Sequence, residues 1–158
     1  VFGFTAEVER AMRRVLAGKA AGHSGMGTTL AANPLVFAAL DAALGHLHTA
    51  ATHAAMRARA VDLEGRLRAM FAQRGLDWHV SRVGARLEFG FGPAPRNGSE
   101  AEAAMHPALE RALHLWLLNR GSLLTPFHNM LLTAPMLEPA AVEHLCGALE
   151  EFLATTLP

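Results

Sequence analysis

The chain has 158 residues, of which 51% are hydrophobic and 18% are charged, so it is long and apolar enough to bury a core, and disorder is excluded. With 14 basic and 14 acidic residues the formal net charge is zero, which gives no indication of a nucleic-acid partner. One cysteine excludes an internal disulfide and favours a cytoplasmic setting, and no apolar run approaches a membrane span. Because the chain starts at Val rather than Met, we expect a domain or fragment of a longer protein.

The first part of the chain predicts helices separated by a loop of small residues. Thr5 is a natural N-cap for the first helix, and residues 19–32 form the loop. Asn33-Pro34 then begins a second helix, since Asn caps well and Pro is favoured in the first turn. The helical pattern from Pro34 to Arg74 is too long for one ordinary helix, so we expect a break near Gly45–Thr49.

The second part predicts a small, mainly antiparallel sheet flanked by helices. Two segments that alternate apolar and polar residues, joined by Gly84-Ala85, are typical of a hairpin. Ser99 and Glu102 fit a capping box for a helix that ends at Gly121. The sum is an α+β, two-layer fold with three or four strands. The expected strands are residues 78–83, 86–91, 122–125 and 130–133, and the last helix begins at Glu138-Pro139.

The segment His23–Leu35 carries the most informative pattern. Glycines at 22, 25 and 27 let the backbone bend so that N–H groups can converge, and Thr28 and Thr29 add two hydroxyl donors. A concave loop of donors that leads into a helix N-terminus suits an anion, most naturally a phosphate. Glycine-rich loops before helices are mostly plain connections, so the composition alone leaves both interpretations open.

Two segments resemble the class III pyridoxal-phosphate aminotransferases. The run Gly27-Thr28-Thr29-Leu30-Ala31-Ala32-Asn33-Pro34-Leu35 is similar to the family's Gly-Thr-Leu-small-Gly-Asn-Pro-Leu segment, and the branch it looks most like is glutamate-1-semialdehyde aminomutase. The run Asn119–Pro126 resembles a late Arg-Gly-aliphatic-aliphatic-small-Pro strand. The resemblance covers nearly all of this chain but corresponds only to the C-terminal part of such an enzyme. In this chain Thr28 stands where the family commonly has Gly, and Ala32 stands where it usually has its second Gly.

The resemblance implies that residues 61–158 form the small C-terminal domain of a fold-type-I aminotransferase, and that residues 1–60 are an interface or linker segment left from the large domain. It implies that Thr29, with Thr28 and Gly27 beside it, binds the phosphate of pyridoxal 5'-phosphate across the interface of a homodimer. The intact parent then transfers an amino group between a small-molecule amino donor and a carbonyl acceptor, as a transaminase or an aminomutase.

The same resemblance implies that this chain lacks the family's Schiff-base lysine, which lies well before the Gly-Thr motif and thus upstream of Val1. The single lysine, Lys19, is too close to Thr29 to match that position and fits a solvated loop residue. We therefore assign no catalytic residue and expect the chain alone to be inactive. A second hypothesis, from another class, is a non-catalytic binding or dimerisation module that keeps the fold without the chemistry.

Other candidate site residues are fewer. Arg86 stands among apolar residues of a predicted strand, where it could hold a substrate carboxylate in a bidentate pair; an edge-strand arginine on the solvent side is the alternative. His46, His48 and His53 are close in sequence but contain no i, i+4 pair on one helix face, so we predict no metal site. Cys146 lies on the predicted core face of a helix, where thiols are inert.

Overall fold

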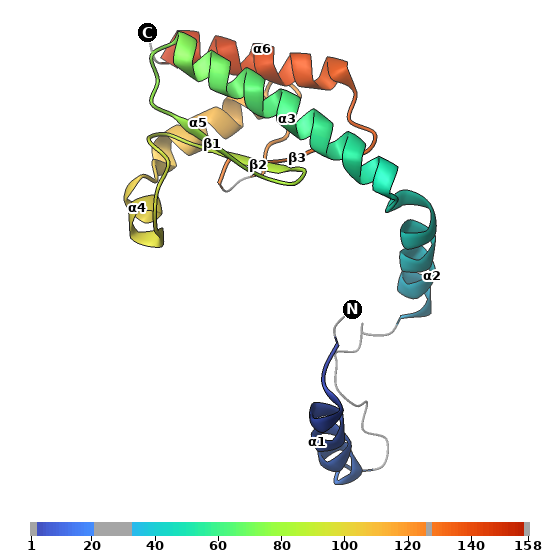
Figure 1. Cartoon of the computed structure of the whole chain (residues 1–158). Helices are drawn as coiled ribbons and strands as arrows, with labels where there is room; N and C mark the ends of the chain where they lie inside the picture. Colours follow the sequence, from blue (N-terminus) through green and yellow to red (C-terminus); the bar gives the residue numbers. More distant parts are fainter. Residues whose placement is uncertain (1–2, 21–32, 126–127, 157–158) are drawn as a thin grey trace. The chain divides into compact units, whose positions relative to one another are not determined.

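A computed structural model describes residues 3–20, 33–125 and 128–156 (Figure 1). The chain divides into two compact units, Val1–His46 and Leu47–Pro158. The sequence-based division at residues 60 and 61 falls inside the helix α3 (Ala50–Gln73), whereas the compact units meet between His46 and Leu47.

The first unit contains α1 (Ala6–Ala17) and α2 (Pro34–Ala42), each capped as predicted. The hydroxyl of Thr5 accepts a hydrogen bond from the amide of Val8 at 3.4 Å. The side-chain oxygen of Asn33 accepts from the amide of Leu35 at 2.9 Å, so it satisfies a donor that the helix itself cannot pair. Neither helix contains a buried residue, so their apolar side chains are not part of a core within the described chain.

The predicted break in the long helical pattern is confirmed. After α2 the backbone forms a π-helical turn, η1 (Ala43–Leu47), and His48 lies in a bend. The hydroxyl of Thr49 then caps α3 by accepting from the amide of Thr52 at 3.1 Å. Along α3 the buried side chains begin only at Ala60. They recur at helical spacing as Ala60, Leu63, Leu67, Met70 and Phe71.

In the described residues the sheet has three antiparallel strands in the order β1-β2-β3, and its small size and antiparallel character are as the sequence predicts. They are β1 (His79–Val83), β2 (Arg86–Gly90) and β3 (Met130–Leu132). A glycine at 84, with φ +62°, makes the tight turn between β1 and β2. The predicted strand at 122–125 is wrong. The amide of Ser122 instead donates a hydrogen bond to the carbonyl of Leu117 at 2.9 Å. The start of this segment therefore caps the C-terminal end of the helix that contains Leu117.

The predicted helix before that segment is two helices, α4 (Gly98–Ala103) and α5 (Pro107–Leu118). Pro107 has no N–H to continue the earlier helix, so a new one begins there with His106 as its cap. The predicted capping box is not formed, and the N-cap lies two residues earlier than predicted. Asn97, not Ser99, accepts from the amide of Glu100 at 3.0 Å, and the Glu100 carboxylate accepts from the backbone amide of residue 96 at 2.8 Å.

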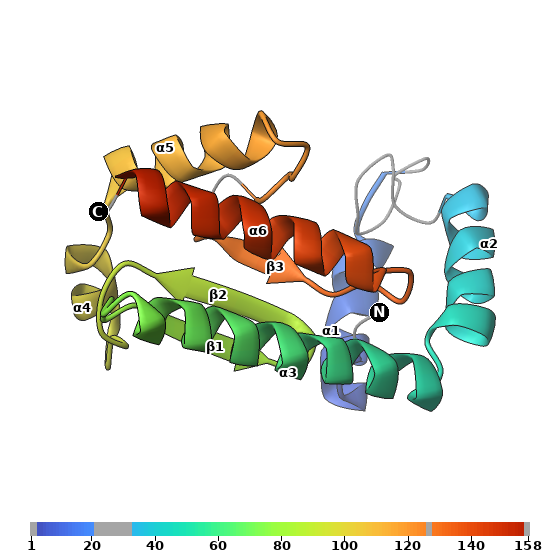
Figure 2. The same cartoon turned by 90° about the horizontal axis from the view of Figure 1, so that it is seen from above.

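Among the described residues, helices pack over one face of the sheet and leave most of the other uncovered. Figures 1 and 2 show α3 and α6 (Pro139–Thr156) side by side over the strands, with α5 beyond α6. Side chains alternate along each strand, so Val80, Leu87 and Phe89 enter the core under these helices. The alternate positions define the open face of the sheet. It consists of Ser81, Val83, Arg86, Glu88, Met130 and Leu132.

Candidate functional site

The predicted phosphate-binding residues Gly27, Thr28 and Thr29 lie outside the described residues, so their role stays a prediction. The start of the next helix is described, and Asn33 already accepts from the amides of Leu35 and Val36, at 2.9 and 3.4 Å. Those two first-turn donors are therefore used by the cap. A phosphate beside this helix depends on the glycine-flanked amides and threonine hydroxyls of the loop, and these are donor types that suit a phosphate.

Lys19 follows directly on α1 and is exposed. Its amide donates to the carbonyl of Leu16 at 3.0 Å, which extends the cap that Gly18 begins. A lysine that anchors a cofactor covalently needs a desolvated, low-pKa amine, and an exposed helix end does not supply that environment. This position fits the solvated lysine that the sequence predicts.

Arg86 lies on the open face of the sheet, at the start of the central strand β2. Its cross-strand neighbours are Val83 on β1 and Leu132 on β3, so it is not on an edge strand. Its guanidinium forms an ion pair with Glu88, two residues along on the same face, and its side chain is 51% exposed. An incoming carboxylate would have to compete with Glu88 for this guanidinium. Substrate binding by Arg86 stays a prediction.

One end of the open face is hollowed into a recess of about 210 Å³, the open-face recess. Two acidic residues line it, Glu88 on the sheet and Glu110 on α5. The carboxylate of Glu110 accepts a hydrogen bond from the amide of His128 at 2.9 Å. Aromatic and thioether side chains, Phe91 and Met105, supply an apolar wall. The recess therefore offers both an apolar surface and acidic groups to a ligand.

Glycine at position 90 lets a side chain lie directly against the backbone in the wall of this recess. A Cβ there would lie 2.3 Å from Cε1 of His79, which is far inside van der Waals contact. The ring of His79 is held over Gly90 by a hydrogen bond between its Nδ1 and the carbonyl of Gly92, at 2.8 Å. Close approach of a side chain to the backbone thus explains this glycine.

The floor of the recess is held by Asn129, which is 3% exposed. Its amide nitrogen donates to the carbonyl of Phe89 at 3.1 Å, and its oxygen lies 3.2 Å from Nε2 of His114. Asn129 and the preceding His128 both have positive φ, 43° and 60°. Asn tolerates this conformation better than most residues, and consecutive non-glycine residues in it are found where surrounding contacts impose them, often at functional sites.

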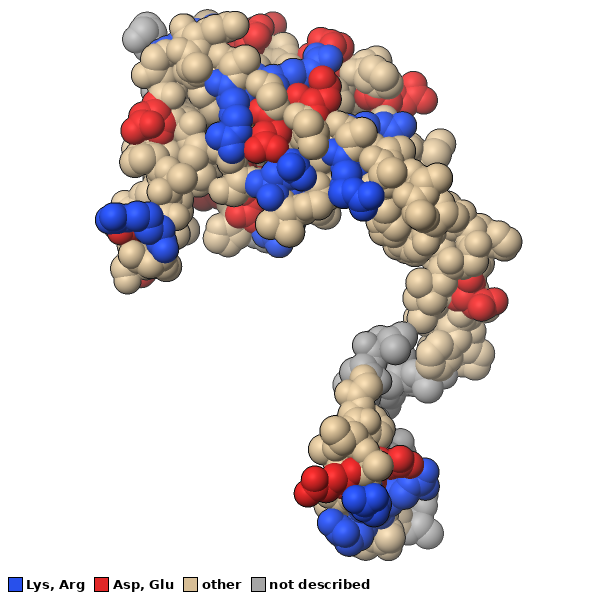
Figure 3. All heavy atoms as spheres, viewed as in Figure 1, with Lys and Arg blue, Asp and Glu red and all other residues tan. Residues whose placement is uncertain are grey.

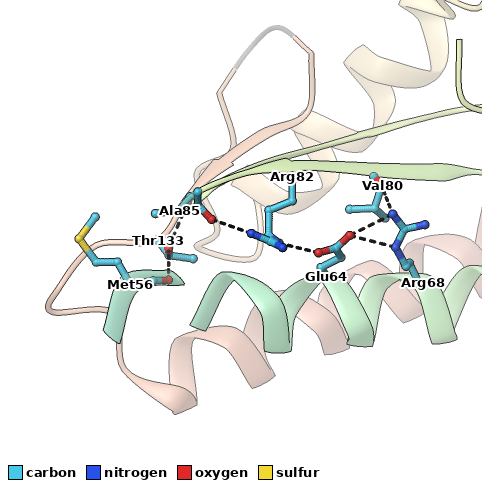
Figure 4. A network of polar contacts seen from close by, with 8 residues as sticks. Met56, Glu64, Arg68, Val80, Arg82, Ala85 and Thr133 are labelled. Atoms are coloured by element: carbon cyan, nitrogen blue, oxygen red, sulfur yellow. Dashed lines mark hydrogen bonds and ion pairs between the residues drawn. The ribbon is translucent and has the colours of Figure 1, made fainter. Parts of the chain in front are cut away.

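A polar network ties the sheet to α3, on the face that the helices cover (Figure 4). Glu64 on α3 accepts from Nε of Arg82 on β1 at 2.6 Å and from Arg68 at 3.0 Å. The hydrogen bond from Arg82, despite some desolvation and with a further contribution from Arg68, holds the pKa of Glu64 below its usual value. The hydroxyl of Thr133 lies 2.9 Å from the carbonyl of Met56 and 3.0 Å from that of residue 85, the neighbour of Arg86. The position of the β1–β2 turn is therefore fixed from two sides.

The described residues give little support for nucleophile chemistry or for a metal site with three or more protein ligands. Cys146 is buried, and burial raises the pKa of its thiol, which disfavours the reactive thiolate. Among the described residues, no three or more His, Cys, Asp or Glu side chains gather into a metal-binding group. Figure 3 shows basic and acidic side chains interspersed along α3, in keeping with the zero net charge. None of the described helices combines the length and apolar character needed to cross a membrane.

Solved structures show which proteins the chain is similar to. The chain matches a glutamate-1-semialdehyde aminomutase from Pseudomonas aeruginosa PAO1, solved in complex with PMP, at 41% identity and a TM-score of 0.87 over 98% of this chain and 35% of that one. A second structure of such an aminomutase from the same organism gives 42% identity and a TM-score of 0.84, over 95% and 34% of the two chains. By these matches the chain is similar to the class III aminotransferases. It matches their C-terminal part, and its fold is that of their small domain.

More distant class III relatives share less of the chain. A β-phenylalanine aminotransferase from Variovorax paradoxus matches at 25% identity with a TM-score of 0.57, over 64% of this chain and 23% of its own. The chain spans about a third of the length of the aminomutases it matches. No protein-family model and no curated protein matches it. The family resemblance carried by the Gly-Thr and Arg-Gly motifs is thus confirmed.

Proposed function

We propose that this chain is the C-terminal portion of a pyridoxal-phosphate-dependent aminotransferase or aminomutase, which moves an amino group between an amino acid or amine and a carbonyl compound. The observation that carries the proposal is 41% identity over 98% of the chain to an aminomutase solved with PMP. When bound, the cofactor supplies the electron sink for this chemistry, and the protein supplies binding and orientation.

Within such an enzyme this chain contributes binding groups rather than the covalent anchor. The hydroxyls of Thr28 and Thr29 and the backbone around Gly27 hold the cofactor phosphate. Arg86 binds a substrate carboxylate, and Glu88 keeps its guanidinium oriented until that carboxylate arrives. No residue of this chain takes the role of the Schiff-base lysine, because the single lysine, Lys19, is an exposed residue at the end of α1.

The first unit supplies the surface for a homodimer. Leu35, Val36 and Phe37, in the first turn of α2, are 78%, 60% and 55% exposed. A helix that is apolar on several sides is stable in water only when another surface covers it. A second copy of the chain is the partner we propose. In light scattering the intact enzyme is expected to be a dimer, and Phe37→Asp is expected to shift it toward monomer; an unchanged dimer would remove α2 from the interface.

The absorbance spectrum of the chain with pyridoxal phosphate tests the assignment of roles. We expect no band of lysine-bound cofactor and no amino transfer from the 158-residue chain alone. A band that appears and is then lost in Lys19→Ala would show that this chain has its own covalent anchor. That outcome would overturn the division of labour proposed above.

The alternative is a non-catalytic binding or dimerisation module. The absorbance test and the DNA sequence upstream of Val1 together distinguish it from the enzyme. A reading frame that continues upstream into a lysine-containing segment supports the enzyme. A gene start immediately before Val1 would favour the module.

A further inference from the structure

Two histidines meet where α3 begins. His48 lies in the bend after η1, and His53 lies in the first turns of the helix. Nδ1 of His48 is 3.4 Å from Nε2 of His53, and the two rings are stacked with centroids 5.4 Å apart. Helical spacing alone predicts that these side chains diverge. They converge because His48 precedes the N-cap and is not on the helix.

Local backbone bonds hold the two residues in this arrangement. The amide of Thr49 donates to the carbonyl of Leu47 at 2.9 Å, which fixes the bend that contains His48. The hydroxyl of Thr49 accepts from the amide of Thr52 at 3.1 Å, and its carbonyl accepts from the amide of His53 at 3.0 Å. The backbone positions of both histidines are therefore set by the cap itself, and only side-chain rotation remains.

The distance between the two nitrogens suits a shared metal ion better than a direct hydrogen bond. Nitrogens that bind one ion at about 2.0–2.1 Å, at a tetrahedral angle, lie about 3.4 Å apart. A good hydrogen bond from a ring nitrogen is usually about 2.7–3.2 Å long. Both histidines are exposed, so their rings can rotate out of the stacked arrangement and direct both lone pairs at one ion.

We propose that His48 and His53 form a surface site for a divalent transition-metal ion that prefers imidazole, such as Zn²⁺ or Cu²⁺. The described residues contain no metal-binding group of three or more ligands, so two protein ligands bind the ion and water completes its coordination. A bound ion ties the bend at residue 48 to the first turns of α3, and so stiffens the η1–α3 connection. This proposal is independent of the amino-transfer function.

Calorimetric titration of the full chain with Zn²⁺ alone tests the site, and His46 provides a matched control because it is an exposed histidine on η1. We expect one ion to bind per chain. His48→Ala and His53→Ala are each expected to weaken binding about tenfold or more, because even loss of a group that only orients a metal ligand costs about 10–100-fold. His46→Ala is expected to bind as the wild type does.

Nitrogen NMR of the imidazoles provides the second measurement. Zn²⁺ is expected to shift the signals of His48 and His53 and to leave that of His46 in place. Equal affinity in the wild type and His53→Ala, or equal weakening in all three variants, would overturn the proposal. Circular dichroism of each variant checks that the helices are intact.

Discussion

Replacing Thr133 by valine tests the joint that fixes the sheet to α3. Thr133 is 1% exposed, and its hydroxyl lies between the carbonyls of Met56 and Ala85, at 2.9 and 3.0 Å (Figure 4). Valine has nearly the same shape, so the change removes the hydroxyl without leaving a cavity. A hydroxyl has one proton and donates one of these bonds at a time. The substitution therefore removes one hydrogen bond and leaves a carbonyl less well satisfied.

The expected loss in the free energy of unfolding is about 1–2 kcal/mol, from the net value of one hydrogen bond and the cost of a poorly paired, part-buried carbonyl. The carbonyl of Ala85 keeps its bond from the amide of Thr133 at 3.0 Å, which limits the loss. With a urea dependence of about 1–3 kcal/mol per molar, the unfolding midpoint falls by about 0.3–2 M. Fluorescence of Trp78 and Trp116 reports it, because both lie in the second unit.

Thr155→Val is the matched control, since its hydroxyl donates to the carbonyl of Glu151 at the exposed end of α6. It is expected to change stability by less than about 0.5 kcal/mol. If Thr133→Val lies within the same range as Thr155→Val, the joint does not stabilise the second unit and the reasoning is wrong.

Three further substitutions test other parts of the second unit. The side chain of Leu67 has no exposed surface, so Leu67→Ala is expected to lower the free energy of unfolding in urea by about 2–5 kcal/mol. The side chain of Leu115 is 60% exposed, and a loss no larger than that of Leu115→Ala would contradict the packing described. The hydrogen bond from Arg82 lowers the pKa of Glu64, so this carboxylate contributes stability that is present above its ordinary pKa of 4.5 and is lost as the pH falls below it. Glu64→Gln removes that carboxylate, so the free energy of unfolding is expected to depend less on pH in an acid titration. An unchanged slope of the free energy of unfolding against pH would contradict this. Asn129→Ala is expected to destabilise more than Asn129→Gly, by about 1 kcal/mol in thermal unfolding, because only glycine accepts the positive φ freely; equal losses would refute the strain argument.

Much of the fold is predictable from local patterns in the sequence. The caps at Thr5 and Asn33, the break before α3 and the hairpin turn at Gly84 each depend on residues close in the chain. The errors arise where two local signals compete. Ser99 and Glu102 have capping-box spacing, but Asn97 and Glu100 have it too, and Pro107 then ends the predicted continuous helix.

The candidate site is predictable to a smaller extent. The strand position of Arg86 follows from alternation, but its central place in the sheet and its pairing with Glu88 depend on β3, which comes from far along the chain. The floor at Asn129 likewise depends on Phe89 and His114, because side-chain pairs of this kind leave no periodic signal. The meeting of His48 and His53 is missed for another reason, since helix spacing does not apply to a residue in a bend.

The central claim is that this chain holds the cofactor phosphate in an enzyme whose covalent anchor lies elsewhere. The most direct measurement uses a chimera in which this chain replaces the matching C-terminal third of the Pseudomonas aeruginosa aminomutase. We predict that the purified chimera retains pyridoxal phosphate and transfers amino groups, and that Thr29→Val weakens cofactor retention far more than Thr5→Val, at the cap of α1. A folded chimera that binds no cofactor, or that binds it equally well with Thr29→Val, would contradict the account.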